Sequence, residues 1–231
     1  MPLLLAYSGL VRRDFLPTPI EVLLAGVDGI NDGTLIVNTA FSVSEIMAGF
    51  ILASIFAVPL GILMGAFKPI EAFFEPFVSF ARYLPASAFI PLLILWAGVG
   101  EKQKLAVIFI GSVFQVVLMV AMIVGSTRRD LIEAAYTLGA DAGAIVRRVM
   151  LPGAAPQIAE TLRLVLGWAW TYVIVAELVG AETGIGHMIM DSQRLLDTGQ
   201  MIFGIFCIGV IGLVSDLIFK WANQRLYPWA F

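Results

Sequence analysis

The sequence is poor in the residue types from which catalytic, metal and disulfide-stabilised sites are built. Its 231 residues include one cysteine and one histidine, and only 13% of them are Asp, Glu, Lys or Arg. The lone Cys207 has no second cysteine for a disulfide or a metal cluster. His187 has no clustered Cys or carboxylate at metal-ligand spacing. We therefore expect neither a metal site nor catalytic residues.

Two further absences concern nucleotides and nucleic acids. The chain contains no GxxxxGK[ST] loop, so it lacks the usual phosphate site for ATP. Its formal net charge is −3 at pH 7, and it has no basic tract that would follow a phosphate backbone. We expect no cofactor in this chain and no nucleic-acid partner.

Apolar residues, in contrast, are abundant. Hydrophobic residues make up 60% of the chain and the mean hydropathy is +0.94, which excludes a soluble domain. We predict an all-α polytopic membrane protein with a single transmembrane domain over residues 1–231. A helix needs about 20 apolar residues to cross the hydrocarbon core. Five runs are long enough, at 46–67, 76–99, 104–125, 158–181 and 200–220.

The chain opens with a shorter apolar run, MPLLLAYSGLV. About 10 residues are too few to cross the core, so we interpret this run as the second half of a first helix. The alternative is a signal peptide. That alternative lacks a basic region before the apolar run and a clear small-residue cleavage site before Arg12.

The positions of Lys and Arg indicate how the spans are oriented, because positive residues in short loops favour the cytoplasmic side. With both ends inside, the cytoplasmic positions are Lys68, Arg128, Arg129, Arg147, Arg148, Lys220 and Arg225. The outer positions are Arg12, Arg13, Lys102, Lys104 and Arg194. The bias is small, and it puts residues 130–152 in the cytoplasm.

A polar, alanine-rich segment, EAAYTLGADAGAIVRRVMLP at 133–152, interrupts the apolar runs. We predict two short helices here. Asp130 can cap the first, Glu133 can complete a capping box three residues later, and Gly139 can supply a left-handed stop. Asp141 can cap the second helix.

The side chains of this segment favour contact with another molecule. Ala134 and Ala135 let a partner approach the backbone, and Tyr136, Leu138 and Ile145 offer apolar anchors. We expect Leu151 and Pro152 to end the unit, and Pro156 to help turn the chain back towards the membrane. An amphipathic helix lying on lipid headgroups explains the same pattern equally well on physical grounds alone.

The spacing within this segment resembles the EAA signature of permease subunits in bacterial ATP-binding-cassette (ABC) importers. The matching positions are Glu133, Ala134, Ala135, Gly139, Val149, Leu151 and Pro152. Val149 stands where isoleucine is more usual. The resemblance implies that residues 130–152 are a coupling-helix segment that docks on an ATPase. The residues implied in docking are Glu133, Ala134, Ala135, Tyr136, Leu138, Gly139, Ala140, Asp141, Ile145, Leu151 and Pro152.

The resemblance extends over nearly the whole chain and narrows the group. FLPTP at 15–19, RYLPASAFIPLLILWAGVG at 82–100, LPGAAPQI at 151–158, IVAELVGAETGIG at 174–186 and RLYPW at 225–229 are similar to the nitrate, sulfonate, taurine and bicarbonate permeases. Importers of thiamine pyrimidine precursors and of aromatic acids share much of this pattern. The substrate therefore stays open between an anion and a non-anionic nutrient.

This resemblance implies a type I ABC importer permease fold in the bacterial inner membrane. It also implies the partners: two ABC ATPase subunits, which bind ATP and Mg, a second permease copy, expected to be this same chain, and a periplasmic or lipoprotein solute-binding protein. Membrane lipid surrounds the assembly. The alternative from another class is a stand-alone membrane protein, either a channel or an intramembrane enzyme. A channel has no need of a cytoplasmic docking unit, and an enzyme needs clustered catalytic residues at membrane depth, which the sequence lacks.

Ionisable residues inside spans are costly, so they are candidates for the substrate pathway. Arg82 lies about 10 Å along the helix axis from Glu75 and is close to Pro85 and Pro91, which free backbone groups. We interpret Arg82, Tyr83 and Pro85 as a bend that lines the pathway and offers positive charge to an anion. The alternative is an arginine that reaches up to the headgroups.

A second group of candidates lies in the span at 158–181. Arg163, Trp170 and Glu177 recur at sevens on one helix face, and Trp168, Thr171, Tyr172 and Val175 share another. Arg163 and Glu177 are about 21 Å apart along the axis, so each needs a partner elsewhere. Either Trp168 and Trp170 line a cavity or both pack between helices. We expect Glu177 to cap the outer end of the pathway structurally, since it would repel an anion.

Small residues recur every fourth position in the span at 46–67, where Pro59 is expected to kink the helix. They are Gly49, Ala53, Ala57, Gly61 and Gly65. Such a ridge lets another helix approach closely, so it indicates packing and not chemistry.

Overall fold

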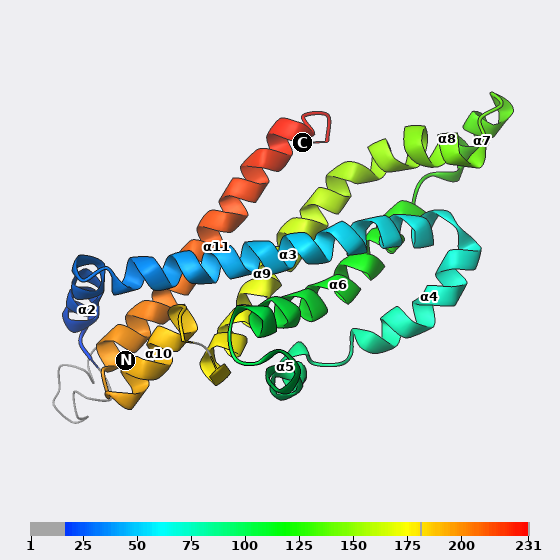
Figure 1. The fold of residues 1–231 in the computed structure, drawn as a ribbon. Helices are drawn as coiled ribbons and strands as arrows, with labels where there is room; N and C mark the ends of the chain where they lie inside the picture. The colour runs from blue at the N-terminus through cyan, green and yellow to red at the C-terminus, as the bar shows by residue number, and fades with distance from the viewer. Residues whose placement is uncertain (1–16, 181, 231) are drawn as a thin grey trace.

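A computed structural model describes residues 17–180 and 182–230, and its regular structure within these ranges is entirely helical (Figure 1). In chain order the elements are α2 (Pro19–Asn31), α3 (Thr34–Ala66), α4 (Lys68–Ala81), η1 (Ala86–Phe89), α5 (Ile90–Ala97), α6 (Glu101–Gly125), α7 (Arg129–Thr137), α8 (Ala142–Ile145), η2 (Val146–Met150), α9 (Leu151–Gly180), α10 (Ile185–Arg194) and α11 (Thr198–Leu226). The expected all-α fold is therefore confirmed.

Four helices are long and apolar enough to cross a membrane: α3, α6, α11 and the continuous helix Ala142–Val179 that contains α9. They coincide with four of the five predicted spans. The apolar run at 1–11, predicted to be half of a first helix, lies outside the described residues. The described chain instead begins its regular structure with α2, whose capping box joins Thr18 and Glu21.

The predicted span at 76–99, for which a bend near Pro85 was expected, is not one continuous helix. The chain forms α4, then the short 3₁₀ segment η1 and α5, and the two halves meet at 78°. The prolines contribute locally: Pro85 and Pro91 lack backbone N–H groups, so the α-helical hydrogen bonds that these groups would donate are missing from this stretch. The N–H of Tyr83 bonds to Phe80 and that of Leu84 bonds to Ala81, which closes the last turn before the break.

Helices α3 and α6 pack along the predicted ridge of small residues. A Cβ atom added at Gly49 would lie 2.8 Å from the Cβ of Ile108, and one at Gly61 would lie 2.7 Å from the carbonyl oxygen of Val117. At Gly65 the nearest atom would be the Ala121 carbonyl oxygen, at 2.5 Å. The two backbones are thus in direct contact, and the prediction that this ridge serves close helix packing is confirmed.

A buried polar cluster joins α3, α9 and α10 at the end opposite α7 and α8 (Figure 1). Ser42 donates a hydrogen bond of 2.6 Å to Oε1 of Glu177, and the backbone N–H of Gly186 donates one of 2.7 Å to Oε2. Ser42 Oγ also accepts from the N–H of Ile185 at 2.9 Å. Glu177 therefore caps the start of α10, where an anion is favoured. Any side chain at Gly184 would meet its carboxyl group at 2.3 Å.

An ion pair extends this cluster to α6. Lys104 Nζ lies 2.5 Å from Oε1 of Glu45 on α3, and the two side chains are 1% and 4% exposed. Lys104 also donates to the carbonyl oxygen of Thr183, just before α10. Lys104, which was counted among the outer positive charges, is therefore buried inside the bundle and not exposed in a loop. Its ammonium group lies inside the bundle because a buried carboxylate partner compensates it.

Arg163 and Glu177 each find a partner elsewhere, as expected. Arg163 Nη1 donates a 3.0 Å hydrogen bond to Oδ2 of Asp216, and its Nε donates to Glu160 at 2.9 Å. Asn223 Nδ2 then donates to the other oxygen of Glu160 at 3.0 Å. This network holds the inner half of α11 against α9.

The contact between α3 and α6 predicts that Gly61→Val destabilises the protein. The added side chain meets the Val117 carbonyl, which cannot move without shifting α6, so we expect a loss of about 1–3 kcal/mol in the free energy of unfolding. The control is Gly209→Val on α11, where no atom lies within 4 Å of the added Cβ. Thermal unfolding of the purified variants in detergent measures both. Equal midpoints for the two variants would contradict the packing described.

The ion pair predicts a non-additive double substitution. Lys104→Met alone leaves Glu45 buried without a partner and should cost about 3–5 kcal/mol. Adding Glu45→Met removes that charge as well, so the double variant should regain most of the loss. Thermal unfolding of the single and double variants in detergent measures this non-additivity. A double variant less stable than Lys104→Met would show that the pair does not form.

Candidate functional site

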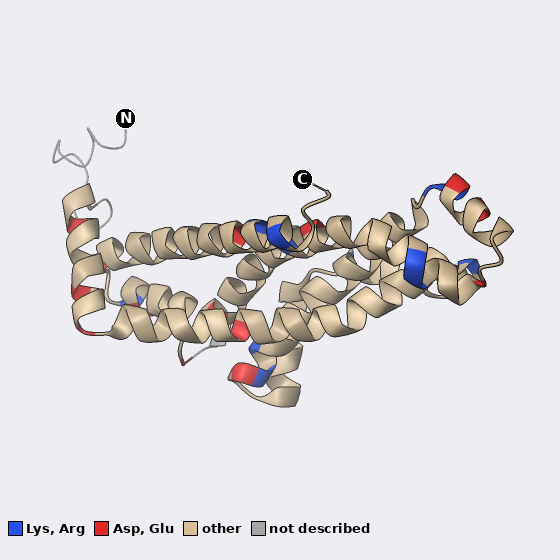
Figure 2. Cartoon of the chain, turned by 90° about the horizontal axis from the view of Figure 1, so that it is seen from above, with Lys and Arg blue, Asp and Glu red and all other residues tan. Residues whose placement is uncertain are grey.

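The first candidate site is residues 130–152, the segment predicted to couple to an ATPase and called the coupling segment below, which protrudes beyond the long helices at one end of the molecule (Figure 1). Figure 2 shows Lys and Arg beside Asp and Glu at this end, in contrast to the mostly uncharged helices. The segment contains α7, α8 and η2. The predicted pair of short helices is therefore present.

The turn between α7 and α8 forms as the sequence predicts. Gly139 has a φ of 82°, and the N–H of Ala140 bonds back to the Ala135 carbonyl, so a left-handed residue ends α7. The Asp141 side chain accepts a 2.9 Å hydrogen bond from the N–H of Ala144, which caps α8. These two features hold the turn in one conformation.

The predicted cap by Asp130 is wrong. Arg128 occupies the N-cap position of α7, and Asp130 lies in the first turn. The Arg128 guanidinium bonds both oxygens of Asp130, which lowers the pKa of that carboxyl below its ordinary value. Paired with Arg128, Asp130 does not cap the helix. The capping box expected between Asp130 and Glu133 is therefore not formed.

The outer surface of the coupling segment carries exposed apolar side chains. Leu138 is 88% exposed and Tyr136 is 55% exposed, beside the exposed Glu133 and Ala134. A groove of about 450 Å³ adjoins Leu138. It is lined by Ala135, Leu138, Gly139, Ala140, Asp141, Ala144, Arg148 and Val149. The groove thus combines apolar side chains with the charged Asp141 and Arg148.

Ile145 faces the other way. It is only 3% exposed and packs in the main core of the protein, so the expectation that it anchors a partner is wrong. Its burial holds α8 against the bundle. Helix periodicity alone does not reveal which apolar side chains of a short helix turn inward.

The expectation that Leu151 and Pro152 end the unit is also wrong, because the helix continues through them to Gly180 (Figure 1). The π-helical turn η2 precedes them, with the N–H of Leu151 bonded to the Val146 carbonyl. Its wider turn leaves room for the ring of Pro152, which would clash with a carbonyl in a regular α-helix. Pro156 likewise lies inside α9.

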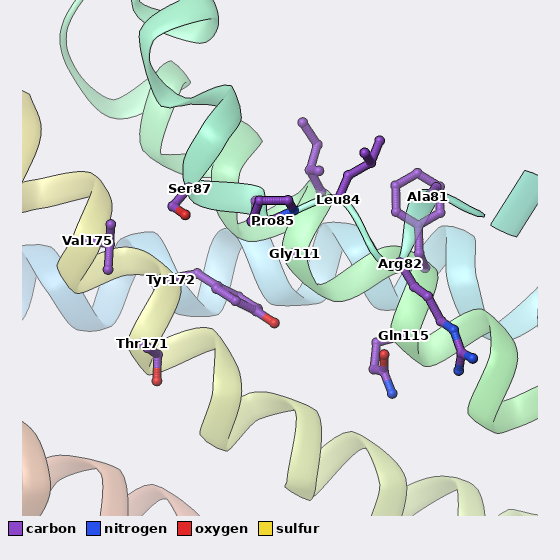
Figure 3. Close-up of a pocket in the computed structure, with 13 residues that line it drawn as sticks. Ala81, Arg82, Leu84, Pro85, Ser87, Gly111, Gln115, Thr171, Tyr172 and Val175 are labelled. Carbon is purple, nitrogen blue, oxygen red and sulfur yellow. The ribbon is translucent and has the colours of Figure 1, made fainter. Parts of the chain in front are cut away.

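The second candidate site is a pocket of about 240 Å³ at the break between α4 and α5 (Figure 3). It lies between the break, α6 and α9. Its lining residues are Ala81, Arg82, Leu84, Pro85, Ala86, Ser87, Ile110, Gly111, Phe114, Gln115, Thr171, Tyr172 and Val175. The predicted pathway residues Arg82, Pro85, Thr171 and Tyr172 thus meet in one place.

The polar groups of this pocket are one cation and several neutral donors. Arg82 supplies the positive charge, and Ser87, Gln115, Thr171 and Tyr172 supply hydroxyl and amide groups. No Asp or Glu lines it. In Figure 3, Arg82 and Gln115 lie on one side and the ring of Tyr172 extends towards them from α9. A group of this composition favours an anion.

One glycine and one glutamine of this pocket, Gly111 and Gln115, were not identified from the sequence. A Cβ at Gly111 would lie 2.5 Å from the ring of Tyr172, so glycine lets that ring lie across α6. Gln115 is the only amide side chain in the predicted span at 104–125, and that isolation among apolar residues was a usable signal.

The other predicted pathway residues lie outside this pocket. Tyr83 is 73% exposed and its hydroxyl accepts a 3.0 Å hydrogen bond from Arg82. Trp170 is 6% exposed and packs in the core, whereas Trp168 is 43% exposed. Glu177 belongs to the buried polar cluster of α3, α9 and α10, where it caps the start of α10. In the described part of the chain, no group of three His, Cys, Asp or Glu side chains could hold a metal.

Comparison with known proteins identifies the family. The model of the binding-protein-dependent transport system inner membrane component matches residues 57–227. The taurine transport system permease protein TauC of Escherichia coli is 35% identical over 226 residues, which cover 95% of this chain and 82% of that protein. The bicarbonate transport system permease protein CmpB of Synechococcus elongatus is 28% identical over 197 residues, or 85% and 70% of the two chains.

The fold is also found in a solved ABC transporter. The structure of the methionine transporter MetNI matches with a TM-score of 0.75 at 18% identity, covering 83% of this chain and 95% of that one. The family model spans most of the chain. The similarity to the taurine permease and the apolar helices of the structure support the same assignment. The chain belongs to the family of binding-protein-dependent transport system inner membrane components, as a multi-pass permease subunit of an ABC importer in the inner membrane.

Proposed function

We propose that the coupling segment docks on a separate ABC ATPase and that two permease copies and two ATPases form the transporter. The observation that carries this proposal is the exposed surface around Leu138, at the tip of a segment with ordered caps. A leucine that is 88% exposed contributes nothing to this chain's own core. Its burial in a partner groove would account for its presence. ATP and Mg would be bound by that partner.

The structure also supports a route by which docking could act on the membrane helices. The helix from Ala142 runs without interruption to Gly180 and carries Thr171 and Tyr172 of the pocket. A rotation imposed at α7 and α8 would therefore reach the pocket through one helix. We infer alternating access, in which closure of the two ATPases opens the pathway outward so that a solute-binding protein can release its cargo.

Docking through this surface predicts that Leu138→Asp separates the permease from its ATPase. Because Leu138 is so exposed, the substitution should leave folding intact while binding weakens about 30-fold or more, as expected of a hot-spot residue. Co-purification of the ATPase from mild detergent measures the effect. The matched control is Leu195→Asp, since Leu195 is 79% exposed near the opposite end. Equal ATPase recovery with both variants would contradict docking at Leu138.

We infer that the cargo is a small anion of the taurine, alkanesulfonate, nitrate or bicarbonate type. The pocket at the α4–α5 break offers the Arg82 guanidinium with neutral donors around it and no lining carboxylate. Sulfonate and carbonate groups take hydrogen bonds from such a set, and arginine presents several donors at fixed geometry. The names of the taurine and bicarbonate relatives support the same class.

An anion at this pocket predicts that Arg82→Gln lowers uptake. A charge-assisted hydrogen bond contributes about 1.5–3 kcal/mol, so uptake at low substrate concentration should fall about 10- to 100-fold. The variant Arg82→Lys keeps the charge but lacks the planar guanidinium fork. Its uptake should lie between that of the unsubstituted protein and that of Arg82→Gln. The measurement is ATP-driven uptake of labelled taurine or bicarbonate into vesicles with the binding protein present. Unchanged uptake by Arg82→Gln would remove Arg82 from the pathway.

A further inference from the structure

One face of α9 connects two pockets that lie at different levels of the bundle. It is made of two rows of residues spaced by seven: Gln157, Leu164 and Thr171 in one row, and Thr161, Trp168 and Val175 in the other. Residues seven apart lie on the same side of an α-helix, and rows offset by four are neighbours. We call this set of six residues the heptad face of α9.

The two ends of the heptad face each open into a pocket. Thr171 and Val175 line the pocket beside Arg82 described above. Gln157 and Thr161 line a second pocket of about 530 Å³ towards the coupling segment, together with Glu160 and Trp229. The ends of each row are about 21 Å apart along the helix axis. Both pockets carry polar side chains, so both ends of this face can hold water or a polar solute.

The middle of the heptad face is apolar and uncovered within the chain. Leu164 is 50% exposed and Trp168 is 43% exposed. Beside them, Gly167 has no atom within 4 Å of the position that a Cβ would take. The space beside Gly167 is therefore open, and none of the described helices packs over this glycine.

The exposed face of α11 provides a contrast. Its large exposed side chains are all apolar over more than two turns: Ile205, Phe206, Val210, Leu213, Val214, Leu217 and Ile218. Such a face suits lipid. The heptad face of α9 differs, because it places Gln157 and Thr171 on either side of Leu164 and ends in two polar pockets.

We propose that the exposed residues of the heptad face of α9, Gln157, Leu164, Trp168 and Thr171, form a water-exposed wall of the translocation pathway, and that Leu164 and Trp168 are its apolar constriction between the two pockets. This inference rests on the proposed transport function. An apolar constriction between wetted compartments stops ions when it closes and dries, and passes them when it widens. The constriction lies on the same continuous helix as the coupling segment, so movement at α8 would rotate it directly.

The test is the reactivity of cysteines placed on this face in the complete transporter in membrane vesicles. Cys207 is first replaced by Ala, and Leu164→Cys or Gly167→Cys is then introduced. The probe is sulfonatoethyl methanethiosulfonate, a charged thiol reagent that stays in water. The matched control is Leu213→Cys on α11, where Leu213 is 58% exposed, close to the value for Leu164. Protein mass after timed exposure gives the labelling rate without reference to transport.

Since the reactive species is the thiolate, which needs water, Leu164→Cys and Gly167→Cys should react about tenfold or more faster than Leu213→Cys. Labelling of Gly167→Cys should also block uptake. Rates as slow as that of Leu213→Cys would overturn the inference and mean that lipid or protein covers the face. That result would leave ATP-driven uptake, and with it the proposed function, intact. Fast labelling in a complex without ATP-driven uptake would instead contradict the proposed function alone.

A second experiment isolates the constriction. In inside-out vesicles the reagent approaches Thr171→Cys from the side of the inner pocket and must pass Trp168. Adding Trp168→Ala should raise the labelling rate of Thr171→Cys several-fold, while Trp168→Phe keeps a ring there and should change it little. An unchanged rate with Trp168→Ala would show that Trp168 does not narrow the pathway.

Discussion

Every backbone polar group at membrane depth needs a partner inside the protein, and the pocket beside Arg82 depends on that constraint. The helix is broken between Ala81 and Ala86, where Pro85 has no backbone N–H to donate, so the break must lie against other parts of the bundle. It lies against α6 and α9. The bare surface of Gly111 lets the ring of Tyr172 lie across α6 and contribute to the pocket wall. The irregular backbone thereby forms one wall of a polar pocket in an otherwise apolar protein.

The rest of the molecule keeps the helices that meet at this break in place. Glycines bring α3 and α6 into backbone contact, and the Lys104–Glu45 pair and the Glu177 carboxyl join their outer ends to α10. At the inner end, the buried Ile145 holds the coupling segment to the bundle. Among the described helices, α9 contributes residues to both candidate sites and to the buried polar cluster around Glu177.

Local features of this fold were predictable from sequence, and contacts between helices were not. The stop at Gly139 and the cap at Asp141 depend on neighbours within four residues, so pattern alone predicts them. The same pattern wrongly predicts an N-cap at Asp130, because Arg128 competes for its carboxyl group. The buried pairing of Lys104 with Glu45 joins residues 59 positions apart, and no spacing rule reports it. Arg82 and Pro85 were predicted as a bend, whereas the 78° angle between its halves depends on packing.

The π-helical turn at Val146–Met150 separates two surfaces of one helix. Before it, α8 exposes Ala142 and Gly143 while Ile145 packs in the core, and after it α9 buries Ala154 and Ile158 in the same core. A π turn carries one more residue than an α turn, so it sets the rotational phase between these surfaces. The proposed contact with an ATPase and the proposed contact with a solute can therefore be shaped by separate stretches of sequence. The solute contacts of such a fold can then change while the surface proposed to bind the ATPase stays the same.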